Sequence, residues 1–341
     1  MPMRILGIET TGAFASVALL EREDQPERHE AEAVKIDVIH GNDRFSHLQN
    51  LTPQIKELLD RHGLSVNDMD GIAVSRGPGS FTGIRIGVST ARALSQVTGI
   101  PCIPVSSLEA LALRGTELLA EAEAEGKATP AGPEESEDHD GAAPADGVLI
   151  CPILDARRTQ VYAGGYRLMR QDGEIGIREV IPAKSFLMEE FLDRIEGESP
   201  VLFLGDGINT CGEIIRKRRT VADGFAGEYA ANDKPEETGS PAALDTAAAE
   251  EPAGGQRNLA IFAGKADRYQ DASAVAKMGW KRMRESRTCG YMELQPEYMR
   301  MAEAERKLRQ RQMEERQRQQ NEARAGQTAG TGRPVEERRH G

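Results

Sequence analysis

Apolar positions in the first hundred residues form short runs and one-sided helical patterns. Apolar runs at 3–8 and 14–20 flank the turn-like Glu9-Thr10-Thr11-Gly12 and predict a β-hairpin. Residues 43–61 predict an amphipathic helix. Its apolar face holds Leu48, Leu51, Ile55, Leu58 and Leu59.

A second strand-and-helix pattern follows that helix. Residues 71–75 predict a short buried strand, and a glycine-rich turn comes after it. The turn leads into a helix predicted at 84–97, because Gly99 and Pro101 are typical of a helix end.

The pattern beyond residue 107 again mixes strands and helices, although no internal repeat is visible in the sequence. Helices are predicted at 108–119, near 185–195, after Gly207 and at about 259–278, and strands at 148–154, 160–168 and 201–204. This order predicts an α/β protein of two lobes with mixed sheets. Residues 303–325 are rich in Arg, Gln and Glu, which predicts a polar helical or frayed tail.

The net charge of −12 is unevenly distributed along the chain. Residues 117–147 carry −9, residues 223–255 carry −7, and residues 300–341 carry +4, which leaves the rest neutral. The two acidic segments have few apolar residues and are predicted to be disordered insertions, because little burial would offset the entropy of ordering them. The acidic composition therefore does not identify a basic partner.

The spacing of the cysteines and the length of the apolar runs exclude several classes of protein. Cys102, Cys151, Cys211 and Cys289 are isolated from one another, which argues against a zinc site and a disulfide framework. No apolar run is long enough to span a membrane, and the first residues do not resemble a signal peptide. We expect a cytoplasmic protein without membrane association.

The glycine-rich turn at 77–83 is the most distinctive local motif. A glycine turn between a strand and a helix is able to hold a phosphate with backbone N–H groups. It is not a P-loop, since Ile84 and Arg85 stand where that motif requires Lys and Ser or Thr. The alternative is a tight turn with Ser80 or Thr82 as the helix N-cap.

The helix after this turn has two apolar stripes instead of one. Ile84, Gly87, Val88, Ala91, Leu94 and Ser95 form the first stripe, and Ile86, Thr90, Ala93 and Val97 lie nearly opposite. The second stripe is expected to be covered either by another helix of this chain or by a partner protein.

Candidate catalytic groups are few. The six histidines are scattered, and His47 is followed one turn later by Leu51, so no pair of histidines at i and i+4 exists there. Glu9 and Asp155 are acids at predicted strand ends, where α/β sites lie, and Asp206 fits a turn or a helix cap. We predict no catalytic, cofactor or metal site.

Several motifs occur in a fixed order along the chain. The longest is Gly77-Pro78-Gly79-Ser80-Phe81-Thr82-Gly83-Ile84-Arg85-Ile86-Gly87. The others are residues 4–11, Ser46-His47 with Pro53, 105–112, 154–162, 205–207 and 296–305. Together these motifs resemble the TsaB family, the dimerisation subunits of the bacterial tRNA threonylcarbamoyladenosine machinery, and the glycine motif is the most specific of them. The resemblance covers most of the chain except the acidic insertions and the tail.

The resemblance implies an actin-like, Hsp70-like ASKHA fold of two RNase-H-like lobes. The N-terminal lobe is expected at 1–106, the C-terminal lobe at 107–299 and the tail at 300–341. It implies a subunit without catalytic machinery of its own and without a cofactor. ATP and a metal ion act in the partner subunits.

Its implied partner is TsaD, which transfers threonylcarbamoyl to N6 of the adenosine beside the anticodon in ANN-decoding tRNAs. The ATPase TsaE docks on that pair, tRNA binds through the complex, and a homodimer is the alternative when TsaD is absent. TsaD holds its metal with two histidines a helix turn apart, and Leu51 departs from that pattern. Glu9 stands where the family usually has Asp, and His47-Leu48 where it has His-Ser.

The partner interface is expected on the two helices of the N-terminal lobe and on the glycine turn. Its predicted residues are His47, Leu51, Pro53, Gly77, Pro78, Gly79, Ser80, Phe81, Thr82, Gly83, Arg85, Ile86, Thr90, Ala93 and Val97. The alternative function is an active ATP-dependent ASKHA enzyme, either a small-molecule kinase or a TsaD-like metal-dependent transferase. Turnover of ATP by the isolated protein would distinguish the two.

Overall fold

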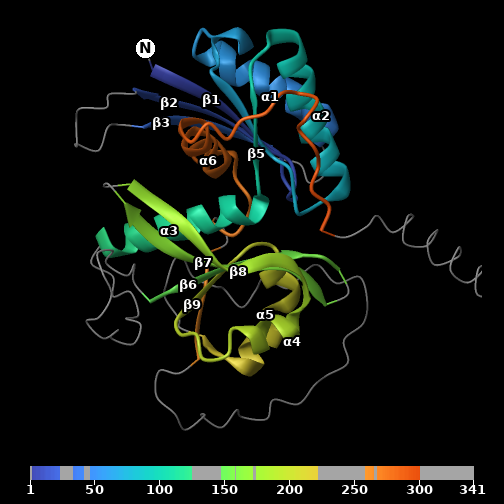
Figure 1. Cartoon of the computed structure of the whole chain (residues 1–341). Coiled ribbons are helices and arrows are strands. Elements are labelled where there is room, and N and C mark those ends of the chain that lie inside the picture. Colours follow the sequence, from blue (N-terminus) through green and yellow to red (C-terminus); the bar gives the residue numbers. More distant parts are fainter. Residues whose placement is uncertain are drawn as a thin grey trace, which may run out of the picture. The chain divides into compact units, whose positions relative to one another are not determined.

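A computed structural model describes residues 2–23, 34–41, 47–124, 147–157, 159–171, 174–221, 258–264 and 267–299. The acidic segment at 223–255, most of the one at 117–147 and the tail at 300–341 lie outside the described residues. The described elements form two sheets with helices on both faces (Figure 1).

The first sheet has five strands in the order β3-β2-β1-β4-β5. The predicted hairpin is confirmed, because β1 (Pro2–Glu9) pairs antiparallel with β2 (Ser16–Glu23), and β3 (Lys35–His40) adds to the outer edge of β2. On its other side β1 pairs parallel with β4 (Gly71–Ser75), which pairs parallel with β5 (Cys102–Val105).

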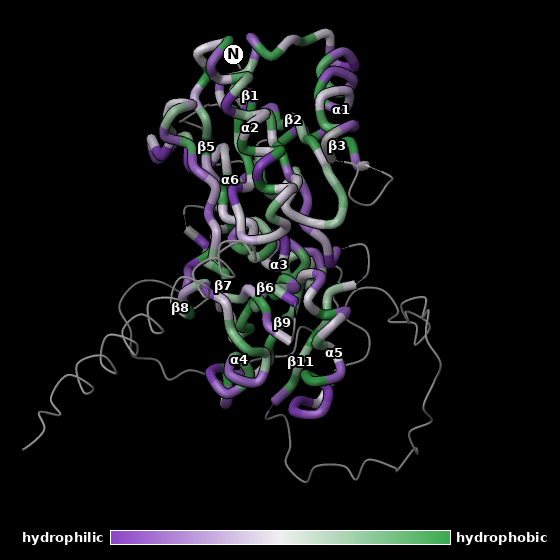
Figure 2. Tube along the Cα trace, turned by 90° about the vertical axis from the view of Figure 1, so that its right-hand side faces the viewer, coloured by the Kyte–Doolittle hydropathy of each residue, from purple (hydrophilic) through white to green (hydrophobic). Residues whose placement is uncertain are grey.

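Alternating residues of the first sheet face two different helical layers. Leu6, Ile8, Val17 and Leu19 pack with α1 (His47–Arg61) and α2 (Phe81–Thr98). Ile5, Ala18 and Leu20 point to the other face, where they pack with α6 (Ala272–Arg284). The period of two along each strand therefore places apolar residues on both faces. Helix α1 carries apolar and polar residues in alternating patches, as Figure 2 shows.

The second sheet has six strands in the order β10-β11-β9-β6-β7-β8. They are β6 (Leu149–Asp155), β7 (Gln160–Gln171), β8 (Glu174–Leu187), β9 (Val201–Leu204), β10 (Thr220–Val221) and β11 (Leu259–Phe262). One face packs with α4 (Met188–Arg194) and α5 (Gly207–Arg218), and the other with α3 (Ser107–Ala124). A short 3-10 helix, η1 (Val66–Asp68), precedes β4.

The two lobes repeat one topology that the sequence does not display as a repeat. Each lobe begins with three antiparallel strands, which are followed by helix, strand, helix, strand and helix. The first lobe runs in this order from β1 to α3, and the second runs from β6 to α6 with the extra strand β10 after α5. The last helix of each repeat covers the sheet of the other: α3 packs on the second sheet and α6 on the first. The predicted boundary at residue 106 falls between β5 and α3, while α6, from the predicted C-terminal lobe, packs on the first sheet.

Two predicted helices are partly wrong. Residues 259–262 form β11 in the interior of the second sheet, and the helix begins at Ala272, where Asp271 accepts a hydrogen bond from the N–H of Ser273 at 2.7 Å. Residues 185–187 belong to β8, so α4 begins at Met188. Leu187 of β8 is followed directly by Met188 of α4, so the two apolar patterns merge in the sequence. Between β11 and α6 the sequence does contain Gly264, but the apolar run at 259–263 was counted as part of the helix.

The prediction that residues 117–147 form a disordered insertion is wrong for the first residues of that segment. Helix α3 continues to Ala124, and Leu118, Leu119 and Ala122 are buried. Glu117 accepts hydrogen bonds in ion pairs with Arg114 at 3.4 Å and with Lys277 at 2.6 Å. The first residues of this segment therefore belong to the folded protein.

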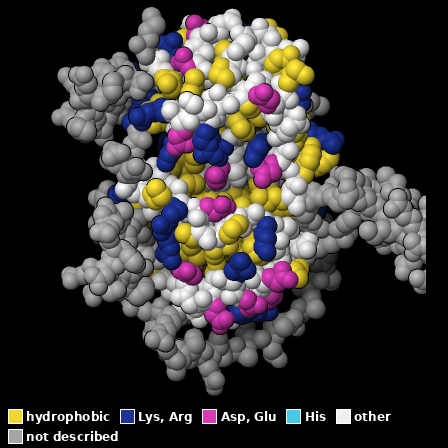
Figure 3. Space-filling model, in the orientation of Figure 1, with side chains coloured by type: hydrophobic (Ala, Val, Ile, Leu, Met, Phe, Trp, Pro, Cys, Tyr) yellow, Lys and Arg dark blue, Asp and Glu magenta, His cyan; other side chains and the backbone are white. Residues whose placement is uncertain are grey.

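The surface carries both signs of charge. On the face drawn in Figure 3, basic and acidic side chains are intermixed, with apolar side chains between them. Within the described part of the chain, no helix is long and apolar enough to cross a membrane.

Candidate functional site

The glycine turn between β4 and α2 packs directly against the hairpin turn between β1 and β2. The N–H of Ser80 donates to the carbonyl of Thr11 at 2.8 Å, and the hydroxyl of Thr10 donates to the carbonyl of Gly83 at 2.7 Å. A Cβ at Gly79, where φ is +152°, would lie 2.5 Å from the Thr11 carbonyl oxygen, and a Cβ at Gly83 would collide with the Thr10 carbonyl. Glycine is required at both positions by this close approach of two backbones.

The predicted N-cap is confirmed at Ser80. Its hydroxyl accepts the N–H of Gly83 at 3.3 Å, and Gly99 ends the helix in a left-handed conformation. The N–H groups of Ser80 and Gly83 are thus occupied within the protein. Two donors that a phosphate at this turn would require already have partners.

Glu9 lies at the centre of a buried hydrogen-bond cluster next to the turn. Its carboxylate accepts from the N–H of Thr11 at 2.5 Å, from the Thr11 hydroxyl at 2.6 Å and from the Ser75 hydroxyl. The Thr11 hydroxyl, which donates to Glu9, accepts from Ser107 at 2.9 Å. Burial raises the pKa of Glu9, and the hydrogen bonds from Ser75 and Thr11 partly oppose that rise. The cluster joins β1, β4 and α3.

The other two acids considered from the sequence lie together, apart from this cluster. An oxygen of Asp206 accepts the N–H of Asp155 at 2.9 Å, and Asp155 accepts the N–H of Arg157 at 2.7 Å. These bonds connect the end of β6 to the start of α5, which is the turn role expected for Asp206. Across the described residues, no three His, Cys, Asp or Glu side chains are grouped in a way that could hold a metal ion.

The outer stripe of α2 is open to solvent over its second half. Val97 is 87% exposed, Ala93 is exposed, and Ile86 and Thr90 are half-buried. Helix α1 lies beside α2, and the half-buried Ile86 packs against the core cluster to which both helices contribute. Of the two explanations for the second stripe, a neighbouring helix of this chain accounts only for its half-buried part.

The predicted interface residues divide into a surface group and a supporting group. Pro53, Thr82, Arg85, Ala93 and Val97 are exposed, and Gly79, Ser80, Phe81, Ile86 and Thr90 are half-buried. Leu51, Gly77, Pro78 and Gly83 are buried inside the chain, with Leu51 only 1% exposed in the core under α1. These four support the surface from below and do not form it. The side chain of His47, the first residue of α1, lies outside the described residues.

A segment whose contact with the glycine turn was not predicted from the sequence fixes the start of α2. Residues 287–299, the C-terminal strap, follow α6 and bridge to β5 through Cys102 and Cys289. The N–H of Glu297 donates to the Arg76 carbonyl at 2.7 Å, and their side chains form an ion pair at 3.0 Å. Leu294 is buried in the core under α1 and α2. The strap therefore holds the glycine turn from its other side.

The strap ends in a stack of side chains on the first turn of α2. The Tyr298 ring lies 4.8 Å from the Phe81 ring, and the Arg85 guanidinium lies 3.9 Å above Phe81. The Nε of Arg85 donates to the Tyr298 hydroxyl at 2.9 Å. Tyr298 lies more than two hundred residues from Phe81, so no local pattern in the sequence predicts this contact.

Comparison with known proteins assigns the family. A family model described as "TsaD: tRNA N6-adenosine threonylcarbamoyltransferase" matches residues 44–124, which include α1, β4, α2, β5 and α3. The "tRNA threonylcarbamoyladenosine biosynthesis protein TsaB" of Bacillus subtilis (strain 168) is 34% identical over 204 residues, 60% of this chain and 71% of that protein. The protein of the same name from Haemophilus influenzae is 34% identical over 34% of this chain and 44% of its own length.

The fold agrees with these relatives. A solved structure described as a Pseudomonas aeruginosa protein with similarity to the peptidase YeaZ superposes with a TM-score of 0.56 at 20% identity, covering 87% of this chain and all of that one. The predicted ASKHA fold of two RNase-H-like lobes is confirmed. With 71% of the Bacillus subtilis protein matched at 34% identity, the chain belongs to the TsaB family of tRNA threonylcarbamoyladenosine biosynthesis proteins.

Proposed function

We propose that this chain serves tRNA threonylcarbamoyladenosine biosynthesis as a subunit that pairs with TsaD and has no catalytic activity of its own. The paired surface is the outer stripe of α2 together with the exposed side of α1, and TsaE docks on the resulting pair. The observation that carries the proposal is the open apolar stripe of α2, on which Val97 is 87% exposed.

An exposed apolar stripe on a helix favours a partner over solvent. Burying Val97 would contribute roughly 1.5–3 kcal/mol, because transfer of its apolar surface from water is favourable. The neighbouring Ala93 and Thr90 are small, which allows a second helix to approach closely along the same stripe. Two helices from each partner would then form a four-helix contact.

The similarity to TsaD supports the identity of the partner. The TsaD family model matches 44–124, the segment that contains both α1 and α2. A partner built on the same segment offers helices of similar shape, so the two chains would meet about an approximate two-fold axis. Arg85 adds a charged contact. Within the described residues its guanidinium stacks on Phe81 but its Nη atoms have no hydrogen-bond or ion-pair partner, and a TsaD carboxylate would pair with them.

The test measures TsaD binding by variants of the stripe. Ala93→Arg and Val97→Arg each place a charge in the proposed contact, and an unpaired buried charge costs about 3 kcal/mol or more. We expect the Kd for purified TsaD to rise more than about a hundredfold. Val180→Arg is the matched control, because Val180 is also an exposed valine (39%) but lies on β8 of the other sheet.

The readout is isothermal titration, with circular dichroism to check that each variant is folded. Wild-type affinity in folded Ala93→Arg and Val97→Arg would refute this surface as the TsaD contact. Equal losses in all three variants would show that the added charge weakens binding wherever it is placed.

A further inference from the structure

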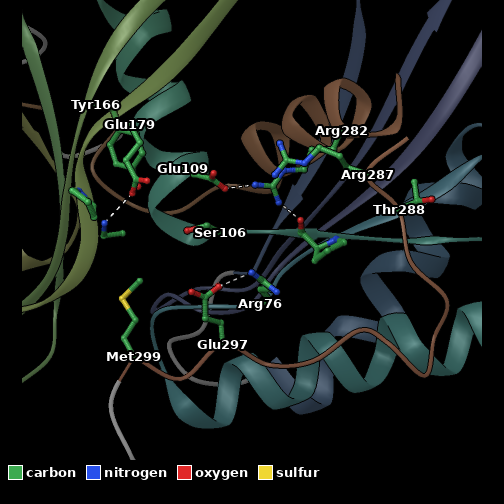
Figure 4. Close-up of a pocket in the computed structure, with 13 residues that line it drawn as sticks. Arg76, Ser106, Glu109, Tyr166, Glu179, Arg282, Arg287, Thr288, Glu297 and Met299 are labelled. Carbon is green, nitrogen blue, oxygen red and sulfur yellow. Dashed lines mark hydrogen bonds and ion pairs between the residues drawn. The ribbon is translucent and has the colours of Figure 1, made fainter. Parts of the chain in front are cut away.

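A pocket of about 450 Å³ lies away from the α2 stripe and has no role in the proposed pairing. Elements of both sheets line it: the ends of β4 and β5, the start of α3, strands β7 and β8, the end of α6 and the strap (Figure 4). Its volume lies in the range of small-molecule sites.

Three arginines line this pocket. Arg282 is 7% exposed, and its two Nη atoms donate to the Pro104 carbonyl and to Glu109. Arg76 pairs with Glu297 at 3.0 Å, and Arg287 has a 3.3 Å contact with Glu285 on the exposed surface. Burial lowers the pKa of Arg282, Glu109 opposes that fall, and the positive charges of Arg287 and Arg76 add to it. Arg282 is thus repelled by both of the other lining arginines.

Two of the lining arginines have an unsatisfied buried atom. Within the described residues, the Nε atoms of Arg76 and Arg282 have no hydrogen-bond partner. Ser106 also lines the pocket and immediately precedes α3, an 18-residue helix. The amino-terminal end of a helix favours negative charge. A negative group at this position would relieve the repulsion between the arginines.

The carboxylates that line the pocket are already engaged. Glu109 pairs with Arg282, Glu297 pairs with Arg76, and Glu179 accepts the N–H of Ala183 at 2.9 Å. Arg287 is the lining arginine whose acidic partner, Glu285, does not line the pocket and is itself exposed. Arg287 is therefore the group with most capacity to bind a ligand.

The remaining wall is apolar. Tyr166, which is 1% exposed, Pro182, Ala183 and Met299 face the pocket from β7, β8 and the strap (Figure 4). A ligand with an anionic group at the arginines would place an apolar or aromatic body against these side chains.

We propose that this pocket binds a small organic oxyanion. Its phosphate or carboxylate is held by Arg287, Arg76 and Arg282 beside the start of α3, and its apolar body lies against Pro182 and Met299. The site is separate from the TsaD contact proposed above, so either proposal stands if the other fails.

The experiment titrates phenyl phosphate and phenylacetate into the full chain by isothermal titration calorimetry, with phenol as the uncharged comparison. We expect saturable binding of at least one anion and none of phenol. The Kd of that anion should rise about tenfold or more in Arg287→Ala, since a charge-assisted hydrogen bond is lost. The stronger of the two anions identifies the headgroup as phosphate or carboxylate.

Arg284→Ala is the matched control, because Arg284 lies near Arg287 at the end of α6, stacks on Trp280 at 4.7 Å and does not line the pocket. It should bind the anion like wild type, and Arg287→Lys should recover part of the affinity. The proposal is overturned if neither anion binds the wild type saturably, if phenol binds equally well, or if folded Arg287→Ala keeps the wild-type Kd.

Discussion

Gly79 and Gly83 are where the glycine turn meets the hairpin turn, and their lack of a side chain is what permits the contact. Thr10 and Thr11 approach α2 so closely that any Cβ at 79 or 83 would meet a carbonyl oxygen. The phosphate-binding interpretation of the turn also loses support, because two N–H groups that a phosphate would need already have partners. The carbonyl of Thr11 in the hairpin turn accepts the N–H of Ser80, and the Ser80 hydroxyl accepts the N–H of Gly83.

Comparing the stability of Gly79→Ala with that of Gly99→Ala separates the cost of a strained backbone conformation from the cost of a steric collision. Both glycines have positive φ, which costs an alanine about 1–2 kcal/mol, but Gly99 has nothing within 4 Å of its Cβ position. At Gly79 the collision with Thr11 adds about 1–3 kcal/mol. We expect urea unfolding to show a clearly larger loss of stability for Gly79→Ala. Equal losses would mean that the hairpin turn can move away at little cost.

For single residues, the sequence predicts those structural roles that depend only on neighbouring residues in the chain. Ser80 as an N-cap and Gly99 as a helix end follow from residue preferences within one turn of the helix, and both are present. The partners of the glycine turn, Thr11 and Tyr298, lie about 70 and over 200 residues away, and their contacts depend on tertiary packing. No single-sequence pattern encodes such pairs.

Elements with a clear apolar pattern were predicted well, whatever their length. Strands β4 and β9 match the predictions at 71–75 and 201–204, and α1 ends at Arg61 as predicted, whereas β3, β5, β8, β10 and β11 were not predicted. Strand β11 has four residues, and a short apolar run has too few positions to distinguish a strand from part of a helix. Asp271 was the available signal, since an N-cap acid inside 259–278 indicates that the helix starts after it.

Because α3 extends to Ala124, the effect on Tm of deleting the first acidic segment depends on where the deletion begins. Replacing residues 125–146 by a Gly/Ser linker should change Tm by less than about 2 °C, because their composition predicts no contribution to the core. Replacing 117–146 by the same linker also removes Leu118 and Leu119, which are buried on the second sheet. Losing each leucine costs about 2–5 kcal/mol, so Tm should fall by at least about 8 °C.

Differential scanning calorimetry of the two deletion variants provides this comparison. A large fall in Tm for the shorter deletion would show that the acidic segment contributes folded structure to the second lobe. An unchanged Tm for the longer one would contradict the burial of the end of α3.

At the scale of the whole molecule, the two halves share a topology but differ in what they offer to a partner. The first lobe carries the open α2 stripe, and the strap ties its glycine turn to residues at the far end of the described chain. The equivalent helix of the second lobe, α5, has Arg216, Lys217 and Arg218 in its last turn, where α2 has no basic residue. An apolar helical contact therefore favours the first lobe.

Reconstitution of threonylcarbamoyladenosine formation on tRNA distinguishes a partner-binding subunit from an enzyme. With purified TsaD and TsaE, and with threonylcarbamoyl adenylate as the donor, omission of this chain should abolish modification, and this chain without TsaD should give none. Val97→Arg should lose activity at low TsaD concentration and regain it when TsaD is raised, because mass action restores a weakened complex. Modification by this chain without TsaD, or turnover of ATP by the isolated chain, would instead support an active ASKHA enzyme.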